Sequence, residues 1–219
     1  MVNVPFSNRS EAGRLLGEKL ATEFARRTQL TNPIVLALPR GGVPVGLGVA
    51  KALRAPLDVV IVRKLGVPWR PELAMGAITS GSFQVWDEDV IQGLGIYPEE
   101  IAAVVSRESK ELARREKLYR GNRAVPRLRD RTVFLVDDGL ATGSSMLAAA
   151  RYVRSLQPAA VIAAAPVGSG EACDRVSKEL DECVCLATPD PFNAVGEWYR
   201  DFRQITDEEV RQLLTPAAA

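Results

Sequence analysis

The chain has 219 residues, of which 47% are apolar and 25% charged, proportions that suit a globular protein with a core of its own. Lys and Arg total 28 against 27 Asp and Glu, so the net charge of +1 gives no general reason to expect nucleic-acid or membrane-surface binding. The absence of histidine excludes Ser-His-Asp and Cys-His catalysis and His-ligated metal sites.

The three cysteines, Cys173, Cys183 and Cys185, lie late in the chain and contain no CxxC pair. An odd, clustered set is a poor disulfide framework and a poor zinc site. We expect small, half-buried apolar residues in a reducing compartment. The first residues lack a basic start followed by an apolar run, and no stretch of about 18 uncharged apolar residues exists, so a cytoplasmic protein without a membrane span is predicted.

The first predicted element is a helix over 10–27, where Leu and Phe recur at helical spacing and Asn8 with Glu11 resembles a cap. A short apolar run rich in β-branched residues predicts a buried strand over 34–38. It ends in the loop 39–44, which contains two glycines and two prolines.

A helix of small residues over 45–53 and a second buried strand over 57–63 follow. Three glycines and two prolines in 64–81 predict a long irregular loop. The alternating run 83–86 predicts a hairpin strand, and the charged amphipathic segment 99–119 predicts a helix.

The last part of the chain repeats a strand-then-helix pattern, and Thr206 with Glu209 makes a capping box at the start of the final helix. Three further buried strands are predicted, over 132–136, 160–167 and 183–187, with an Ala-rich helix to about Leu156 after the first and a helix between the last two. Because the strands are apolar throughout and alternate with helices, we expect an α/β fold: one parallel sheet flanked by helices. No repeat or linker divides the chain, so residues 1–219 form one predicted domain, with a small subdomain built from its Pro-rich and polar ends.

The segment 133–146 carries the most chemistry, because a buried strand runs directly into Asp137 and Asp138 and then into a turn of Gly, Ala, Thr and Ser. Such a turn before a helix lets backbone N–H groups and hydroxyls bind a phosphate. Two carboxylates would repel that phosphate, so they face a sugar diol or a metal ion. Neither a P-loop nor a GxGxxG fingerprint fits the spacing, and a solvated turn with a helix cap is the plain alternative.

Segment 133–146 resembles the motif that binds phosphoribosyl diphosphate (PRPP) in the type I phosphoribosyltransferases. Segment 36–46 looks like that family's pyrophosphate loop, 62–78 like its mobile active-site loop, and 189–210 like the hood over the base, in the same order. The whole pattern most resembles a bacterial subgroup of predicted phosphoribosyltransferases. The resemblance implies a type I phosphoribosyltransferase fold whose hood is formed mainly by about 187–219.

The implied activity is that of a Mg²⁺-dependent glycosyltransferase of the pentosyl class, in which a nitrogenous base displaces pyrophosphate from PRPP. The resemblance places Asp137 and Asp138 at the ribose hydroxyls or beside Mg²⁺, which they would contact directly or through water. One of the two acids could instead cap the next helix. The predicted 5′-phosphate cradle consists of Ala141, Thr142, Gly143, Ser144 and Ser145.

The predicted pyrophosphate site consists of Arg40, Gly41, Gly42 and Arg63. Lys64 is predicted to neutralise the departing pyrophosphate, although a surface lysine at a strand end is an equal alternative. Glu72, in the same segment, could bind Mg²⁺ or a substrate amine.

Base binding is predicted at Val195, Trp198 and Tyr199, with at least one of the two aromatic residues expected to be core. Hypoxanthine-guanine relatives carry an acid where this chain has Ala141, which weakens that specificity and leaves the base unidentified. If the base must lose a proton, a carboxylate, a lysine or water accepts it.

Segment 107–131 contains ten Lys or Arg against four Asp or Glu. A solvated helix face with pairs such as Glu111 and Arg115 is the first interpretation, a dimer interface the second and RNA binding the third. The alternative function is therefore a non-catalytic regulator that senses PRPP or a nucleotide and binds RNA. Hydrolytic chemistry on a sugar phosphate stays open as a third function, and the family resemblance alone implies a homodimer.

Overall fold

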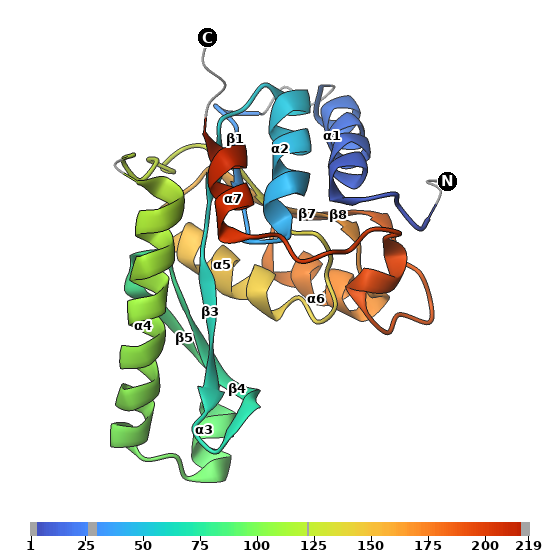
Figure 1. Ribbon diagram of the computed structural model, residues 1–219. Coiled ribbons are helices and arrows are strands. Elements are labelled where there is room, and N and C mark those ends of the chain that lie inside the picture. The colour runs from blue at the N-terminus through green and yellow to red at the C-terminus, as the bar shows by residue number, and fades with distance from the viewer. Residues whose placement is uncertain (1–3, 26–29, 122, 216–219) are drawn as a thin grey trace.

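The computed structural model describes residues 4–25, 30–121 and 123–215, and Figure 1 shows their elements. Five strands form a parallel sheet in the order β2-β1-β6-β7-β8. They are β1 (Ile34–Ala37), β2 (Leu57–Val59), β6 (Thr132–Val136), β7 (Ala160–Val167) and β8 (Glu182–Ala187). All residues of β1 and β6 are buried, as expected for strands covered on both faces. The predicted α/β class and parallel sheet are confirmed.

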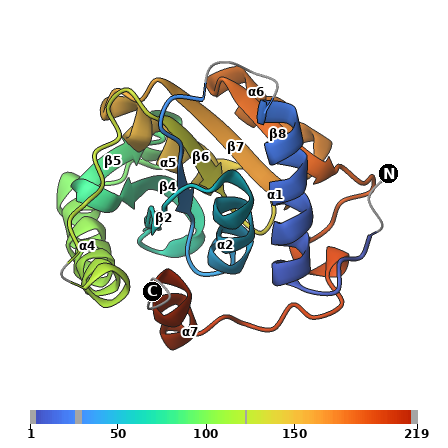
Figure 2. The ribbon, with the colours of Figure 1, turned by 90° about the horizontal axis from the view of Figure 1, so that it is seen from above.

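Helices cover both faces of this sheet (Figure 2). One face packs against α1 (Arg9–Ala25) and α2 (Gly42–Leu53), and the other against α5 (Ser144–Ser155) and α6 (Gly170–Glu179). The predicted cap of the first helix is present, because the Glu11 N–H donates to Asn8 Oδ1 at 3.0 Å. Of the predicted range 10–27, residues 26 and 27 lie outside the described residues.

A second sheet stands beside the first and contains β3 (Val62–Val67), β4 (Arg70–Thr79) and β5 (Phe83–Trp86), all antiparallel. It packs against α3 (Glu88–Leu94) and the long helix α4 (Pro98–Arg120). The predicted irregular loop over 64–81 is therefore wrong. Gly66 fits the strand because a Cβ there would lie 2.4 Å from the Pro71 carbonyl oxygen, and Leu65, Val67, Met75 and Ile78 are fully buried.

The predicted strand 57–63 is also wrong in its extent, because the chain leaves the parallel sheet after Val59. Val60 still donates its N–H to the Ala37 carbonyl, but the N–H of Ile61 donates to Ser80 Oγ at 3.0 Å. From Val62 onward the same apolar run belongs to the second sheet. One continuous hydrophobic segment thus serves two sheets.

The C-terminal part contains the short helix η2 (Val195–Trp198) and the helix α7 (Asp207–Leu214), which begins with the predicted capping box at Thr206. Residues near the N-terminus pair with it: the Phe6 N–H donates to the Trp198 carbonyl and the Arg200 N–H to the Phe6 carbonyl, both at 2.8 Å. The hood boundary at about 187 stays a prediction. Among the described helices, none is long and apolar enough to cross a bilayer.

Candidate functional site

Asp137 and Asp138 lie at the carboxyl end of β6, beside the end of β1. This edge of a parallel sheet is where α/β proteins bind ligands. The Asp138 N–H donates to Asp137 Oδ1 at 2.8 Å. Burial raises the pKa of Asp137 well above its ordinary value, and the charge of Asp138 raises it further. A cation or a hydrogen-bond donor from a ligand would relieve this unfavourable charge.

Arg9, at the start of α1, holds the second acid. Its Nε lies 2.7 Å from Asp138 Oδ2, and its guanidinium also donates to the Arg203 carbonyl at 2.9 Å. The guanidinium carbon lies 3.8 Å from the centre of the Phe202 ring, a cation–π contact, and Arg9 is only 8% exposed. No sequence pattern points to Arg9, because its partner Asp138 is 129 positions away.

The glycine loop after β1 packs directly against the acids. A Cβ on Gly41 would lie 1.9 Å from Asp138 Oδ2, and one on Gly42 would lie 2.6 Å from the Val136 carbonyl oxygen. Gly41 has an ordinary helical φ of −59°, so close approach and not backbone conformation requires glycine there. The structure therefore brings the predicted pyrophosphate loop and the acid pair together.

The Arg40 side chain points to α7, with its Nη1 3.8 Å from Asp207 Oδ1. The same carboxylate accepts from the Tyr119 hydroxyl at 2.5 Å and from Arg114 at 3.1 Å. The hydrogen bond from Tyr119 lowers the pKa of Asp207, and Arg114 lowers it further. Arg40 is thus tethered beside the loop and away from the acids.

The turn between β6 and α5 contains the residues of the predicted phosphate cradle, whose role stays a prediction. Ala141, Thr142, Ser144 and Ser145 are exposed. Gly143 is buried, with a φ of +74° that L-residues rarely adopt. The first N–H groups of helix α5, which begins at Ser144, have no intrahelical acceptors, and the first turn contains no acidic residue that would repel an anion.

Two residues of the α6 segment support this turn from behind. Ser169 Oγ donates to the Ala141 carbonyl at 2.9 Å, and Arg175 donates to the Thr142 carbonyl at 2.5 Å. These bonds occupy carbonyl oxygens of the turn, so N–H groups and the hydroxyls of Thr142, Ser144 and Ser145 are the polar groups that could face a ligand. Neither Ser169 nor Arg175 was predicted from the sequence, because each contacts the turn only through the tertiary fold.

The three predicted base-binding residues occupy different environments. Val195 lies against the turn, since a Cβ on Gly139 would be 2.4 Å from its Cγ1. Trp198 packs on Phe192 with ring centres 6.3 Å apart, and its buried Nε1 has no hydrogen-bond partner within the described parts of the chain. Tyr199 is only 5% exposed, and its hydroxyl donates to the Asp138 carbonyl at 2.5 Å. Its position is that of a core residue, as expected for at least one of the pair.

Arg63 and Lys64 point elsewhere. Arg63 pairs with Glu108 of α4 at 2.5 Å, and exposed Lys64 donates to the carbonyl of Glu72, which is also exposed. Within the described ranges, no hydrogen bond or ion pair joins Arg63 or Lys64 to Asp137 or Asp138. Their predicted roles in pyrophosphate binding stay predictions.

The basic segment 107–131 uses many of its cations within the fold. Arg115 pairs with Glu111 at 2.7 Å, as predicted, and Arg120 pairs with Asp58 at 3.3 Å. Arg123 and Arg131 donate to backbone carbonyls. These contacts support the interpretation of a paired helix face.

Comparison with known proteins gives consistent matches. The family profile described as "Phosphoribosyl transferase domain" matches residues 10–201. Two curated Mycobacterium tuberculosis proteins, "Putative phosphoribosyl transferase MT0597" (strain CDC 1551 / Oshkosh) and "Putative phosphoribosyl transferase Rv0571c" (strain H37Rv), are each 44% identical over 213 residues. The match covers 97% of this chain and 47% of each relative, so the chain spans about half the length of these curated relatives.

Solved structures share the fold. The crystal structure of the protein TT1426 from Thermus thermophilus is 41% identical, with 95% of this chain and 97% of that chain covered and a TM-score of 0.81. The AQ2163 protein from Aquifex aeolicus is 12% identical with a TM-score of 0.50 over 88% of this chain and 82% of that chain, a likeness of fold alone.

Proposed function

This chain belongs to the phosphoribosyl transferase family, and we propose that it joins a nitrogenous base to C1 of PRPP with release of pyrophosphate. One observation carries the proposal. The acid pair Asp137 and Asp138 lies against the glycine loop 41–42 and continues into the exposed turn before α5. A diol, a pyrophosphate and a terminal phosphate are the parts of PRPP that these three features would bind.

The two phosphate groups would bind to backbone donors. The turn 141–145 offers the first-turn N–H groups of α5 and three hydroxyls to the 5′-phosphate. The loop 40–42 would receive the pyrophosphate, with Arg40 able to swing from Asp207, from which it is separated by 3.8 Å. Arginine suits this task because its planar donors match phosphate oxygens.

Asp137 and Asp138 would accept hydrogen bonds from the ribose hydroxyls. As the bond from C1 to the pyrophosphate oxygen breaks, the ribose ring gains positive charge, which nearby carboxylates stabilise. The bond from the base nitrogen to C1 forms, and pyrophosphate leaves with the electron pair. A proton released from the base passes to a carboxylate, a lysine or water, because the chain has no imidazole.

The residues present fit a Mg²⁺ ion. Its preferred ligands are oxygens, and it is commonly held by one or two carboxylates together with substrate phosphates and water. Asp137 offers such a carboxylate. Burial and the charge of Asp138 make its ionised form unfavourable and so raise its pKa, and a bound cation would offset both effects. When bound, Mg²⁺ would neutralise charge on the pyrophosphate oxygens.

An assay of pyrophosphate release from PRPP, with Mg²⁺ and a panel of nucleobases and other nitrogenous acceptors, tests the proposal. Release with at least one acceptor, abolished by omission of Mg²⁺, is the expected result. Tight PRPP binding without turnover on any acceptor would instead support the sensing alternative. The same preparation gives the oligomeric state by sedimentation equilibrium, for which the family resemblance implies a homodimer.

A further inference from the structure

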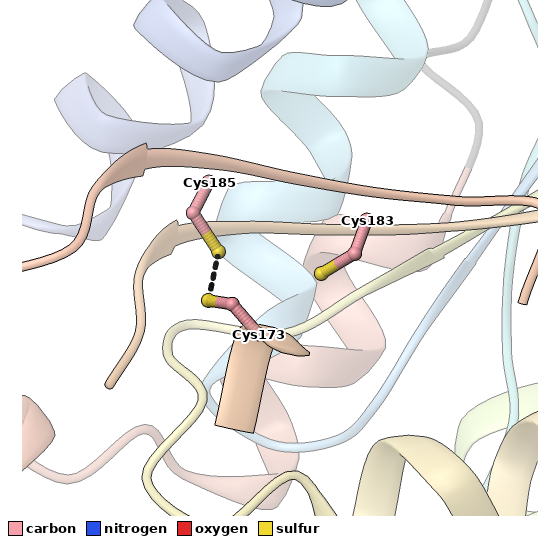
Figure 3. A group of neighbouring side chains, drawn as sticks. All are labelled: Cys173, Cys183 and Cys185. Carbon is pink, nitrogen blue, oxygen red and sulfur yellow. Dashed lines mark hydrogen bonds between the residues drawn. The ribbon is translucent and has the colours of Figure 1, made fainter. Parts of the chain in front are cut away.

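All three cysteines of the chain meet in one place, away from the acids and the phosphate turn. Cys173 lies on α6, and Cys183 and Cys185 lie two positions apart on β8, so they share one face of the strand. Figure 3 shows the three side chains directed into the space between α6 and β8. Their sulfur atoms all lie within 4.8 Å of one another, with Cys173 and Cys185 only 3.1 Å apart.

Small neighbours make this convergence possible. Cys183 and Cys185 are opposite Ala163 and Ala165 of β7, whose side chains occupy little space. A Cβ on Gly168 would lie 2.7 Å from Cys173 Sγ and 3.3 Å from Cys185 Sγ. The expectation of half-buried thiols agrees with the structure, in which all three are partly exposed. Spacing along the chain did not reveal that their sulfur atoms would meet.

We propose that Cys173, Cys183 and Cys185 together bind one thiophilic metal ion, Zn²⁺ or Cu⁺, as three thiolates. Binding releases the three S–H protons and forms three metal–sulfur bonds. Thiolates are the ligands that select these ions among the common cellular metals. Cu⁺ can be three-coordinate, whereas Zn²⁺ would add one exogenous ligand such as water.

The geometry favours a metal ion over a disulfide. Zn–S bonds of about 2.3 Å in tetrahedral directions put sulfur atoms roughly 3.8 Å apart, so modest side-chain rotations suffice from separations within 4.8 Å. A disulfide would use Cys173 and Cys185 and give no reason for the third sulfur. The bound ion would tie α6 to β8, which is the edge strand of the sheet.

Cobalt titration of the reduced, metal-free full-length chain tests the site, because Co²⁺ reports thiolate ligands through charge-transfer absorption. We expect saturation at one equivalent, with thiolate-to-cobalt bands that Zn²⁺ abolishes. A parallel titration with Cu⁺ under anaerobic conditions, against a competing chelator, shows which ion binds more tightly. In Cys183→Ser the affinity should fall by more than about 100-fold, since even loss of a supporting contact costs about 10- to 100-fold.

Asp174→Asn is the matched control. It removes an exposed carboxylate next to Cys173, keeps all three thiols, and should titrate like the unaltered chain. Thiol reactivity of the unaltered chain gives a readout that does not depend on a variant folding: one equivalent of Zn²⁺ should protect all three cysteines from alkylation.

Four results would overturn the proposal. The first is full reactivity of the three thiols in the presence of Zn²⁺, and the second is cobalt binding without thiolate bands. The third is equal affinity in Cys183→Ser. A Cys173–Cys185 disulfide in the purified chain, detected as the loss of two hydrogen atoms by mass, combined with no metal binding after reduction, would identify a redox pair instead.

Discussion

Asp137 and Asp138 are adjacent in the chain but have different charged neighbours. Asp138 has a cation, the Arg9 guanidinium, 2.7 Å away. Asp137 has burial and the charge of Asp138 against it, which together raise its pKa. The fold therefore pairs one carboxylate with a cation and buries the other beside a like charge, which a bound cation or hydrogen-bond donor would relieve.

Substitution of each acid by asparagine should change stability in opposite directions. In unfolded chains Asp137 ionises near 3.8, whereas the folded protein retains the proton to higher pH, so the unaltered chain loses stability as the pH rises above that value. Asp137→Asn should thus raise the free energy of unfolding at pH 7 by about 1 kcal/mol, a gain that disappears in acid. Asp138→Asn should lower it by about 2 kcal/mol because Arg9 is left unpaired.

Urea denaturation at pH 7 and below pH 4 measures both effects. Both variants should lose pyrophosphate release, so Asp137→Asn would become more stable and less active. Equal destabilisation by the two substitutions would contradict the electrostatic difference.

Gly41→Ala tests the close contact between the glycine loop and the acids. The new methyl group would lie 1.9 Å from Asp138 Oδ2, and the carboxylate can move only by giving up its ion pair with Arg9. We expect a loss of about 1–3 kcal/mol in unfolding free energy and at least about a tenfold loss of activity. Gly93→Ala in α3, where a Cβ meets nothing within 4 Å, is the control: it should leave activity unchanged and should not lower the free energy of unfolding. Activity within twofold of the unaltered chain in Gly41→Ala would refute the contact's importance.

At this scale the sequence predicted the acids, the glycines and the small turn, because each sits next to a strand end that periodicity locates. It did not predict Arg9 or Ser169. Both act through tertiary contacts, with partners 129 and 28 positions away, and an arginine in a first helical turn looks solvated when read alone.

Among the elements, strands covered on both faces were the easiest to predict, because β1 and β6 are continuous apolar runs. The hairpin β3–β4 was missed for a physical reason. Gly66 and Pro71 look like loop residues, yet glycine is needed at position 66 because a Cβ there would lie 2.4 Å from the Pro71 carbonyl oxygen. Its buried residues also come from two strands, so no single window of sequence shows the alternation.

The contact of α4 with β3 should depend on pH through Glu108, which is 7% exposed. Burial alone would raise the pKa of Glu108, but hydrogen bonds from Arg63 and Arg107 outweigh it and lower the pKa below the ordinary 4.5. The stabilisation is therefore present above pH 4.5 and is lost as the pH falls through the lower folded value. Glu108→Gln should cost about 1–2 kcal/mol at pH 7.

Denaturation curves from pH 3 to pH 8 check this expectation, since the difference between Glu108→Gln and the unaltered chain should shrink in acid. Glu99→Gln, in the exposed first turn of the same helix, serves as control and should cost less than about 0.5 kcal/mol. A pH-independent difference would contradict a contribution from the charge of Glu108.

On the scale of the whole molecule, the candidate site is assembled from segments far apart in sequence. Arg9 comes from the first helix, Gly41 follows β1, Asp138 follows β6 and Tyr199 comes from the C-terminal part. A ligand that contacts the acids and both loops would cross-link these segments. Ligand binding should therefore stabilise the entire fold.

PRPP with Mg²⁺ should raise the melting temperature. At ~100 times its dissociation constant a ligand adds about 2.7 kcal/mol, which corresponds to roughly 5–10 °C for a domain of this size. Differential scanning fluorimetry measures the shift, with ribose 5-phosphate plus inorganic pyrophosphate as the control for separate binding of the two parts. Asp137→Asn should show a smaller shift, and no shift at millimolar PRPP would contradict the proposed ligand.

The contacts of Arg9 and Tyr199 with Asp138 also have a consequence for biosynthesis. Arg9 is synthesised well before Asp138. Tyr199, whose hydroxyl binds the Asp138 backbone, is synthesised 61 residues after Asp138. All five strands of the parallel sheet precede Tyr199 in the chain, so they are synthesised before the residue whose hydroxyl binds the Asp138 carbonyl. A chain truncated before Tyr199 would therefore carry Asp137 and Asp138 without this contact, and we expect it to lack the assembled site.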